Sequence, residues 1–280
     1  MKAHEMVAKV RTLPSISPAA LKLVGLLAEA NAGNEDVVAT LRQDTVLTAK
    51  LLRACNSPAL GLKEPVASVD QAVLLLGYDQ MHRTATALAM SGAMSVRLPG
   101  YDAQVGLWRH SLFAAAAAEA IINHGADLTD AATAYTAGLL HDIGKLIVCQ
   151  FLTEELRATL HRLVVEGFTT DEAERKLFGT DHAEAGSCLL YLWRLPAQII
   201  EAVANHHQPA LDPHPRFSAV AHVANCIAHL AEGGAGSETY ALPADAHVLA
   251  GLDLDAEKFA NLTNEVRAGS ERVKQLAALA

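Results

Sequence analysis

The stretch GLLHDIGKLI, residues 138–147, places a histidine and an aspartate side by side in an apolar run that we interpret as helical. Burying an ionised carboxylate without a partner is costly, so Asp142 should be exposed, paired with a cation or bound to a metal. Because adjacent helical residues project about 100° apart, His141 and Asp142 could share a metal only near the edge of the buried face. Gly138 and Gly144 leave space for another helix or a ligand to approach.

The simpler alternative is an amphipathic helix in which Asp142 pairs with Lys145 or faces solvent. A histidine–aspartate dipeptide alone is a weak motif, so the choice between a metal ligand and this alternative depends on the rest of the chain.

Composition limits the classes of partner. The chain has 280 residues, 51% of them apolar, which is enough for one large domain or two coupled ones. A net charge of −9 with 22 Lys plus Arg leaves no basic surface for phosphate backbones, so we expect no direct nucleic-acid partner. The most apolar stretch, 112–122, has 11 residues and contains Glu119, so we expect no membrane segment.

The four cysteines are far apart and form no CxxC pair, and the first residues lack the apolar core of a signal peptide. We therefore expect reduced thiols and a cytoplasmic location.

The hydrophobic pattern predicts an all-α protein, because no stretch shows sustained period-two alternation. Capping signals at Ser17, Asp44 and Ser68, the last with Gln71 as a capping box, help to place the helices of the first half. Gly77 is expected as a left-handed C-cap. The predicted helices cover about 17–30, 34–43, 44–55, 68–77 and 78–94. Nothing in this half looks catalytic.

The second half carries chemistry-bearing side chains on four consecutive predicted helices. His110 lies on an alanine-rich helix face, and His141 and Asp142 form the central dipeptide. His182 follows the Asp181 cap, and His206 and His207 end the helix that begins at Pro196. Each histidine could separately be structural, but together they are of the ligand types of Zn, Mn, Fe or Ni, and ligands from several helices often converge in a bundle core. The predicted metal ligands are His110, His141, Asp142, His182, His206 and His207.

Three segments resemble the N-terminal part of an HDOD domain: LPSISPAALKLVGLL (13–27), DTVLTAKLLRACNSPALGL (44–62) and SVDQAVLLLGYDQM (68–81). With the second half, the resemblance covers roughly residues 8–232. It implies a multi-helix HDOD architecture, in which a layer of five or six N-terminal helices packs on an HD-type helical bundle. The histidine series is similar to the ligands of metal-dependent HD phosphohydrolases. Lys145 matches a lysine near the substrate phosphate in HD-GYP phosphodiesterases; a surface lysine is the alternative.

The sequence also departs from these families. Residues 208–215, QPALDPHP, lack the GYP signature, so a cyclic-dinucleotide phosphodiesterase is not supported. Asn225 stands where the superfamily has its last aspartate ligand; its amide could bind a metal but brings no charge. His222 and His229 share its helix face, and we expect both to be exposed.

We divide the chain into an N-terminal half (1–97), an HD-type half with the metal site (98–232) and one or two closing helices (233–280). The short linker RLPGYD, 97–102, predicts that the two halves pack as one unit. No site is expected in the last part, and residues beyond about 270 should fray or contact a partner.

The HDOD resemblance implies a bacterial cytoplasmic signalling or regulatory protein, in which the metal is structural or senses a ligand. Other signalling proteins are its expected partners, and a nucleotide or phosphate ligand and a homodimer stay open. One alternative is an active metal-dependent phosphohydrolase in which Lys145 stabilises phosphate charge. Another is a metal-free helical interaction module.

Overall fold

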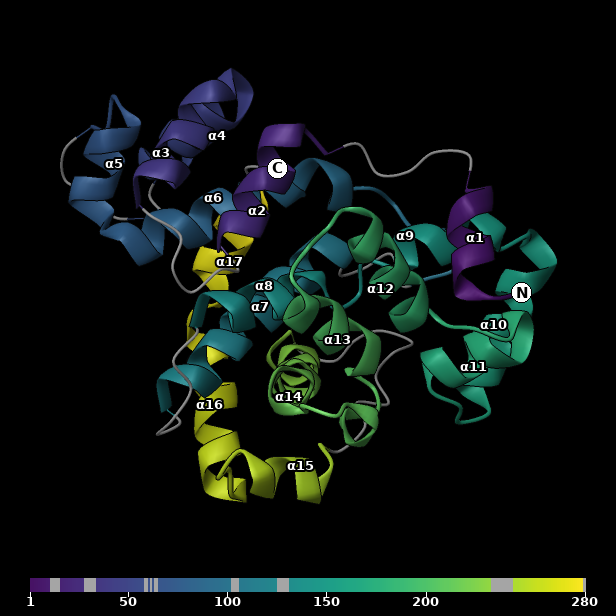
Figure 1. The fold of residues 1–280 in the computed structure, drawn as a ribbon. Helices are drawn as coiled ribbons and strands as arrows, with labels where there is room; N and C mark the ends of the chain where they lie inside the picture. The colour runs from purple at the N-terminus through teal and green to yellow at the C-terminus, as the bar shows by residue number, and fades with distance from the viewer. Residues whose placement is uncertain are drawn as a thin grey trace.

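The computed structural model describes residues 1–10, 16–27, 34–57, 60, 62, 65–101, 106–124, 131–232 and 244–278. These residues form helices joined by loops and contain no strand (Figure 1), which confirms the predicted all-α class.

The helices of the N-terminal layer begin close to where the sequence predicts. They are α2 (Pro18–Leu27), α3 (Asn34–Gln43), α4 (Thr45–Cys55), α5 (Val69–Leu76) and α6 (Tyr78–Met94). Asp44 caps α4 by accepting from the N–H groups of Val46 and Leu47. The predicted end of the first of these helices, near Ala30, lies outside the described residues.

The turn around α5 differs in detail from the prediction. Ser68 accepts from Gln71 N at 3.1 Å, but the Gln71 side chain accepts from Ala67 N instead of Ser68 N, so the capping box is not closed. Gly77 has the expected positive φ, 75°, but its ψ of 163° is extended. The chain therefore turns directly from α5 into α6 and does not complete a left-handed cap.

Helix α1 (Ala3–Lys9) is absent from our predicted set. It lies against α9 (Lys145–Val148) and α12 (His182–Leu192), away from α3 to α5 (Figure 1), with Met6 and Val7 buried. The first residues of the chain thus pack on the second half of the molecule.

Helix α6 contributes to two hydrophobic clusters. Met81 and Leu88 pack in the cluster of the N-terminal layer, whereas Met90 and Met94 pack in the central cluster with α7 (Leu107–His124) and α8 (Ala131–Leu140). Burial on both sides makes α6 the main connection between the layers.

Close helix packing surrounds the second half of the chain. Helices α7, α8 and α14 (Arg216–Ala231) contact one another along alanine-rich faces. A Cβ atom at Gly138 would lie 2.7 Å from the carbonyl oxygen of Ala114, so this crossing of α7 and α8 requires glycine. The expected close approach at Gly138 is confirmed.

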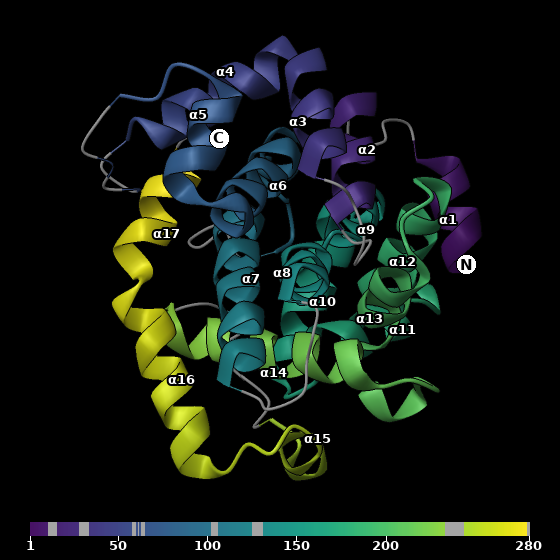
Figure 2. The ribbon, with the colours of Figure 1, turned by 60° about the vertical axis from the view of Figure 1, so that its left-hand side comes forward.

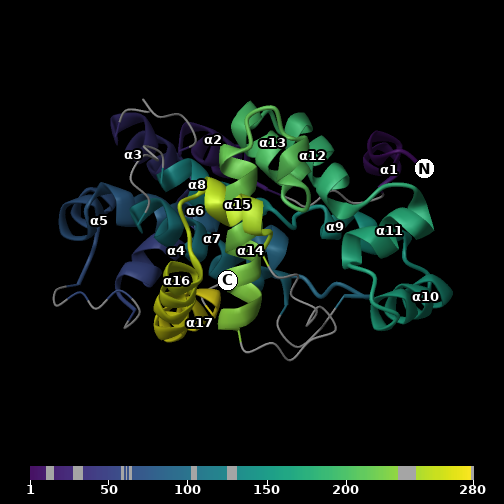
Figure 3. The same cartoon turned by 90° about the horizontal axis from the view of Figure 1, so that it is seen from below.

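The remaining helices surround this bundle, as the view from below shows (Figure 3). Helices α10 (Glu154–Val165) and α11 (Thr170–Phe178) pair around a small cluster of their own at one edge. Helix α13 (Ala197–Asn205) packs between α12 and α14, and two short 3-10 turns, η1 (Cys149–Phe151) and η2 (Pro209–Leu211), follow α9 and α13.

The C-terminal part holds three helices, not the predicted one or two: α15 (Ala246–Gly251), α16 (Ala256–Ala268) and α17 (Ser270–Ala277). Helices α16 and α17 run along α7 (Figure 2). The expected fraying beyond residue 270 is wrong for 270–277, because Val273 and Leu276 pack against the core. No helix among the described residues is long and apolar enough to cross a bilayer.

Candidate metal centre

The central dipeptide lies in a turn, which corrects the prediction that it sits within a helix. Helix α8 ends at Leu140, residues 141–144 form a turn, and α9 begins at Lys145. Hydrogen bonds from Ile143 N to Leu140 O and from Lys145 N to Asp142 O, each 3.0 Å long, tighten the chain to an i→i+3 pattern. The side chains of His141 and Asp142 can therefore face one centre.

Gly144 lets this turn approach α12. A Cβ atom there would come 1.9 Å from the carbonyl oxygen of His182 and 2.5 Å from Gly186 N. Only a residue without a side chain fits, so the expected close approach at Gly144 is confirmed.

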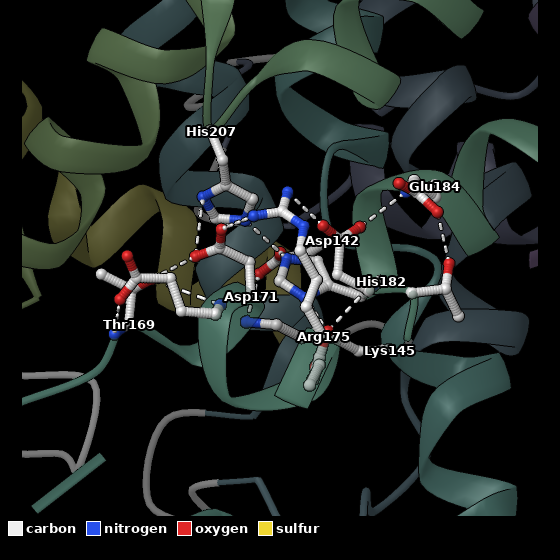
Figure 4. Close-up of polar contacts among 12 residues, drawn as sticks. Asp142, Lys145, Thr169, Asp171, Arg175, His182, Glu184 and His207 are labelled. Carbon is white, nitrogen blue, oxygen red and sulfur yellow. Dashed lines mark hydrogen bonds and ion pairs between the residues drawn. The ribbon is translucent and has the colours of Figure 1, made fainter. Parts of the chain in front are cut away.

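Asp142 lies at the middle of the cluster, and only 2% of its surface is exposed. Its Oδ2 atom is 2.8 Å from Lys145 Nζ and 3.3 Å from His141 Nε2. Its Oδ1 atom is 3.1 Å from His182 Nε2 and 3.9 Å from His206 Nε2 (Figure 4 draws Asp142, Lys145 and His182). Burial alone would raise the pKa of Asp142, but His141 and Lys145 hold it well below its usual value.

The tautomers of two histidines follow from their partners. His141 Nδ1 donates to Gly138 O at 2.8 Å, and His206 Nδ1 donates to Val203 O at 2.8 Å, because a carbonyl oxygen can only accept. Each Nε2 atom is then the nitrogen left to face the cluster, and it is buried without a hydrogen-bond partner. Burial, followed by the nearby histidines, lowers the pKa of His206 well below its usual value, which keeps the ring in the neutral form that binds metals.

His182 is held by a carboxylate that sequence reasoning missed. Glu174, on α11, has no exposed surface, and its Oε2 atom accepts from His182 N at 2.6 Å and from His182 Nδ1 at 2.7 Å. The hydroxyl of Tyr101 donates to its other oxygen. Glu174 lies in the charged stretch 171–176, DEAERK, which reads as a solvated helix face and gives no signal of a buried acid.

His207 lies at the more open side of the cluster, with 15% of its side chain exposed. Its Nε2 atom is 2.8 Å from His182 Nε2, and its Nδ1 atom is 3.7 Å from Asp171 Oδ1. Asp171 in turn accepts from Thr169 and Arg175 (Figure 4). His206 and His207 both follow the last residue of α13, so the two rings leave from the end of that helix.

His110 connects the centre to α14. Its Nε2 atom is 3.8 Å from Asp142 Oδ2 and 3.0 Å from Asn225 Oδ1, and its Nδ1 atom is 3.0 Å from Glu232 Oε2. Burial would lower the pKa of His110, but Glu232 raises it above its usual value. Asn225 therefore reaches the cluster through His110. Glu232, like Glu174, was not predicted.

The expected exposure is wrong for His222, whereas His229 is half-buried. His222 is 7% exposed and its Nδ1 atom donates to His206 O at 2.8 Å, while the His229 ring lies 4.4 Å from the His110 ring, centre to centre. Helix α14 contacts α7, α8, α13 and α16, so the face that carries these histidines is covered.

Lys145 is not a surface lysine. It is 6% exposed, it forms the ion pair with Asp142, and its ammonium lies 5.6 Å from the centre of the Tyr101 ring. The interpretation that Asp142 pairs with Lys145 is thus correct, although the pair is buried and not on a polar edge.

The donor set fits a divalent transition metal. Three groups of side chains among the described residues hold their ligand atoms within 4.8 Å of one another. Two surround Asp142: His110, His141 and Asp142, and His182, His206 and His207. The third, His110, His229 and Glu232, lies on the α14 side of His110. Imidazole nitrogens with a carboxylate suit Zn, Fe, Mn or Ni. The unpartnered nitrogens of His141 and His206 are the buried atoms that a cation would satisfy.

Comparison with known proteins identifies related chains. The model of the HDOD domain family matches residues 13–209. The crystal structure of an HDOD domain protein of unknown function from Geobacter sulfurreducens is 27% identical and has a TM-score of 0.78, covering 98% of this chain and 96% of that one. A candidate phosphohydrolase from Shewanella amazonensis SB2B is 23% identical with a TM-score of 0.72, covering 98% and 97%.

An uncharacterized protein of Treponema pallidum (strain Nichols) is 23% identical over 205 residues, which are 73% of this chain. The match spans only 39% of that relative's length.

Proposed function

Because this chain belongs to the HDOD domain family, we propose that it is a regulatory protein of the bacterial cytoplasm whose cluster around Asp142 binds a divalent transition metal. The expected partners are other signalling proteins. In this account the bound metal stabilises the signalling-competent form or responds to a ligand, and it does not catalyse a reaction.

One observation carries the metal-binding part of the proposal. His141 and His206 each donate Nδ1–H to a backbone carbonyl, and each directs a buried Nε2 without a hydrogen-bond partner toward the same carboxylate. The neutral ring of His206 therefore points a lone pair at an anion in a buried site, which is unfavourable unless a cation lies between them. Lys145 supplies one positive charge, and its Nζ atom lies 2.8 Å from Asp142 Oδ2, whereas His206 faces Oδ1.

Burial favours regulation over catalysis. His141, Asp142, Lys145, His182 and His206 are all buried, so a phosphate ester would need an opening to reach them. Asn225, in place of a carboxylate, also leaves the cluster with one negative charge fewer than an aspartate would give.

A metal-dependent phosphohydrolase is the second candidate, and the ammonium of Lys145 next to Asp142 favours it. The similarity to the candidate phosphohydrolase agrees with this alternative in fold alone. A divalent metal in this cluster would supply Lewis acidity toward a phosphate oxygen. Lys145 would then leave Asp142 to pair with the substrate's negative charge.

Elemental analysis of the protein purified without added metal tests the proposal. We expect a transition metal near stoichiometric amounts in the wild type, its loss in Asp142→Asn, and its retention in Asp253→Asn, which alters an exposed carboxylate paired with Lys258. A wild-type protein that contains no metal, and binds none added during titration calorimetry, would overturn it.

Assays on a generic phosphomonoester and phosphodiester separate the two candidates. The regulatory proposal predicts no turnover above a Lys145→Met control. Metal-dependent turnover that Lys145→Met abolishes would establish the hydrolase instead.

A further inference from the structure

We propose that Glu174 is a positioning residue of the metal centre, because it holds His182 in the tautomer and orientation that direct Nε2 toward Asp142. This inference rests on the proposed metal binding. Glu174 lies on α11, outside the predicted ligand set, and metal binding at full affinity requires it.

The geometry fixes both the main chain and the ring of His182. His182 is the first residue of α12, where backbone N–H groups have no partner within the helix. Glu174 Oε2 accepts from this N–H at 2.6 Å and from the ring Nδ1 at 2.7 Å. One oxygen therefore sets where the helix begins and how its first side chain is turned.

The hydrogen bond also decides which nitrogen can bind a metal. A carboxylate oxygen accepts, so Nδ1 carries the proton, and Nε2 is the nitrogen that remains for a ligand role. That atom lies 3.1 Å from Asp142 Oδ1 and 2.8 Å from His207 Nε2, inside the cluster. Carboxylates that hold metal-binding histidines in this way strengthen metal sites.

Among the candidate ligands, His182 offers the sharpest test of such support. His141 and His206 use backbone carbonyls as Nδ1 acceptors, and no substitution of a side chain removes those. The acceptor for His182 is the side chain of Glu174, whose other oxygen accepts from the Tyr101 hydroxyl. Replacing it changes the ring's support while leaving every ligand in place.

The test is titration calorimetry with Mn²⁺ and Ni²⁺ on the full chain. Glu174→Gln retains the size of the side chain and an acceptor oxygen but removes the charge, and we expect metal affinity to fall by about 10- to 100-fold. The matched control is Glu172→Gln, two residues away on α11, where an exposed carboxylate closes the helix's capping box. That variant should bind metal like the wild type even if α11 loses some stability.

Nitrogen NMR of the Zn²⁺-loaded wild-type protein provides a second readout that does not depend on the variant's folding. We expect a protonated, non-exchanging Nδ1 on His182 and the zinc-bound signature on Nε2. Zinc on Nδ1, or equal affinities of Glu174→Gln and the wild type, would overturn the role of Glu174. A wild-type protein that binds no metal at all would instead overturn the proposed function.

Discussion

Lys145 Nζ lies 2.8 Å from Asp142 Oδ2, and both side chains are almost fully buried. The ammonium is thus a counter-charge for the central carboxylate in the protein without metal. Truncating one partner of a buried ion pair usually costs about 3–5 kcal/mol, because the other charge is left unpaired.

Lys145→Met should therefore destabilise the metal-free protein by about 3–5 kcal/mol. Adding Mn²⁺ or Zn²⁺ should recover part of this loss, because the metal replaces the lysine as the partner of Asp142. Urea unfolding with and without metal measures both effects. An equal loss under both conditions would show that the metal does not reach Asp142.

Gly144→Ala tests the close approach between the central turn and α12. The added methyl group would meet the backbone of His182 and Gly186. We therefore expect destabilisation by about 1–3 kcal/mol or more, and weaker metal binding. Gly92→Ala in α6 is the control, because no atom lies within 4 Å of its added Cβ. The control should be neutral or stabilise by up to about 1 kcal/mol. Similar melting curves for both variants would contradict the packing.

Asn225→Asp tests whether charge at this position is felt by the metal. The carboxylate would face His110, whose Nε2 atom lies 3.0 Å from Asn225 Oδ1 and 3.8 Å from Asp142. Two unit charges ~4 Å apart interact by about 4 kcal/mol at an effective dielectric near 20, before desolvation, so metal affinity should rise. Calorimetry with Mn²⁺ or Ni²⁺ compares the two forms, with the exposed Asn264→Asp as a control. Equal affinities would mean that the added charge acts on His110 but does not affect the metal.

The cysteines should differ in reactivity with their burial. Burial raises the pKa of Cys226 to about 12 and that of Cys55 to about 11, so at pH 8 very little of either thiol is the reactive thiolate. Cys188 is only half-buried. We expect iodoacetamide to label Cys188 first in the native protein, and Cys55 and Cys226 only after unfolding, as peptide mass spectrometry would report. Rapid labelling of Cys226 in the folded state would contradict its placement.

The division of the chain at residue 97 stays a prediction that proteolysis can examine. Because α6 packs in both clusters, we expect no pair of stable fragments from a cut near residue 98. Two fragments that separate on gel filtration and each melt cooperatively would show independent domains.

Local sequence signals predicted the helices well but predicted the neighbours of the site poorly. Caps such as Asp44 and Asp181 act within a few residues, so the starts of α4 and α12 could be read directly. The convergence of the histidines followed from their spacing and the family resemblance. The turn at 141–144 was missed because its apolar residues also fit a continuous helix.

Glu174 and Glu232 were missed for another reason. Glu232 follows the end of α14, 122 residues from His110, and only tertiary packing brings the two together. Glu174 is only 8 residues from His182, but it lies in a charged stretch that reads as a solvated helix face. Tertiary packing also buries His222, because helices that precede and follow α14 in the sequence pack against it. The sequence indicates on which face of its helix a polar residue lies, but it does not indicate which other helix packs against that face.

The central claim is that a transition metal lies between Asp142 and its histidines, and a metal-edge anomalous difference map of a crystal tests it most directly. The account predicts one strong peak about 2.0–2.2 Å from the Nε2 atoms of His141 and His206 and from an oxygen of Asp142. A map with no peak there, in a crystal soaked with Mn²⁺, Ni²⁺ or Zn²⁺ in which Lys145 still pairs with Asp142, would contradict it.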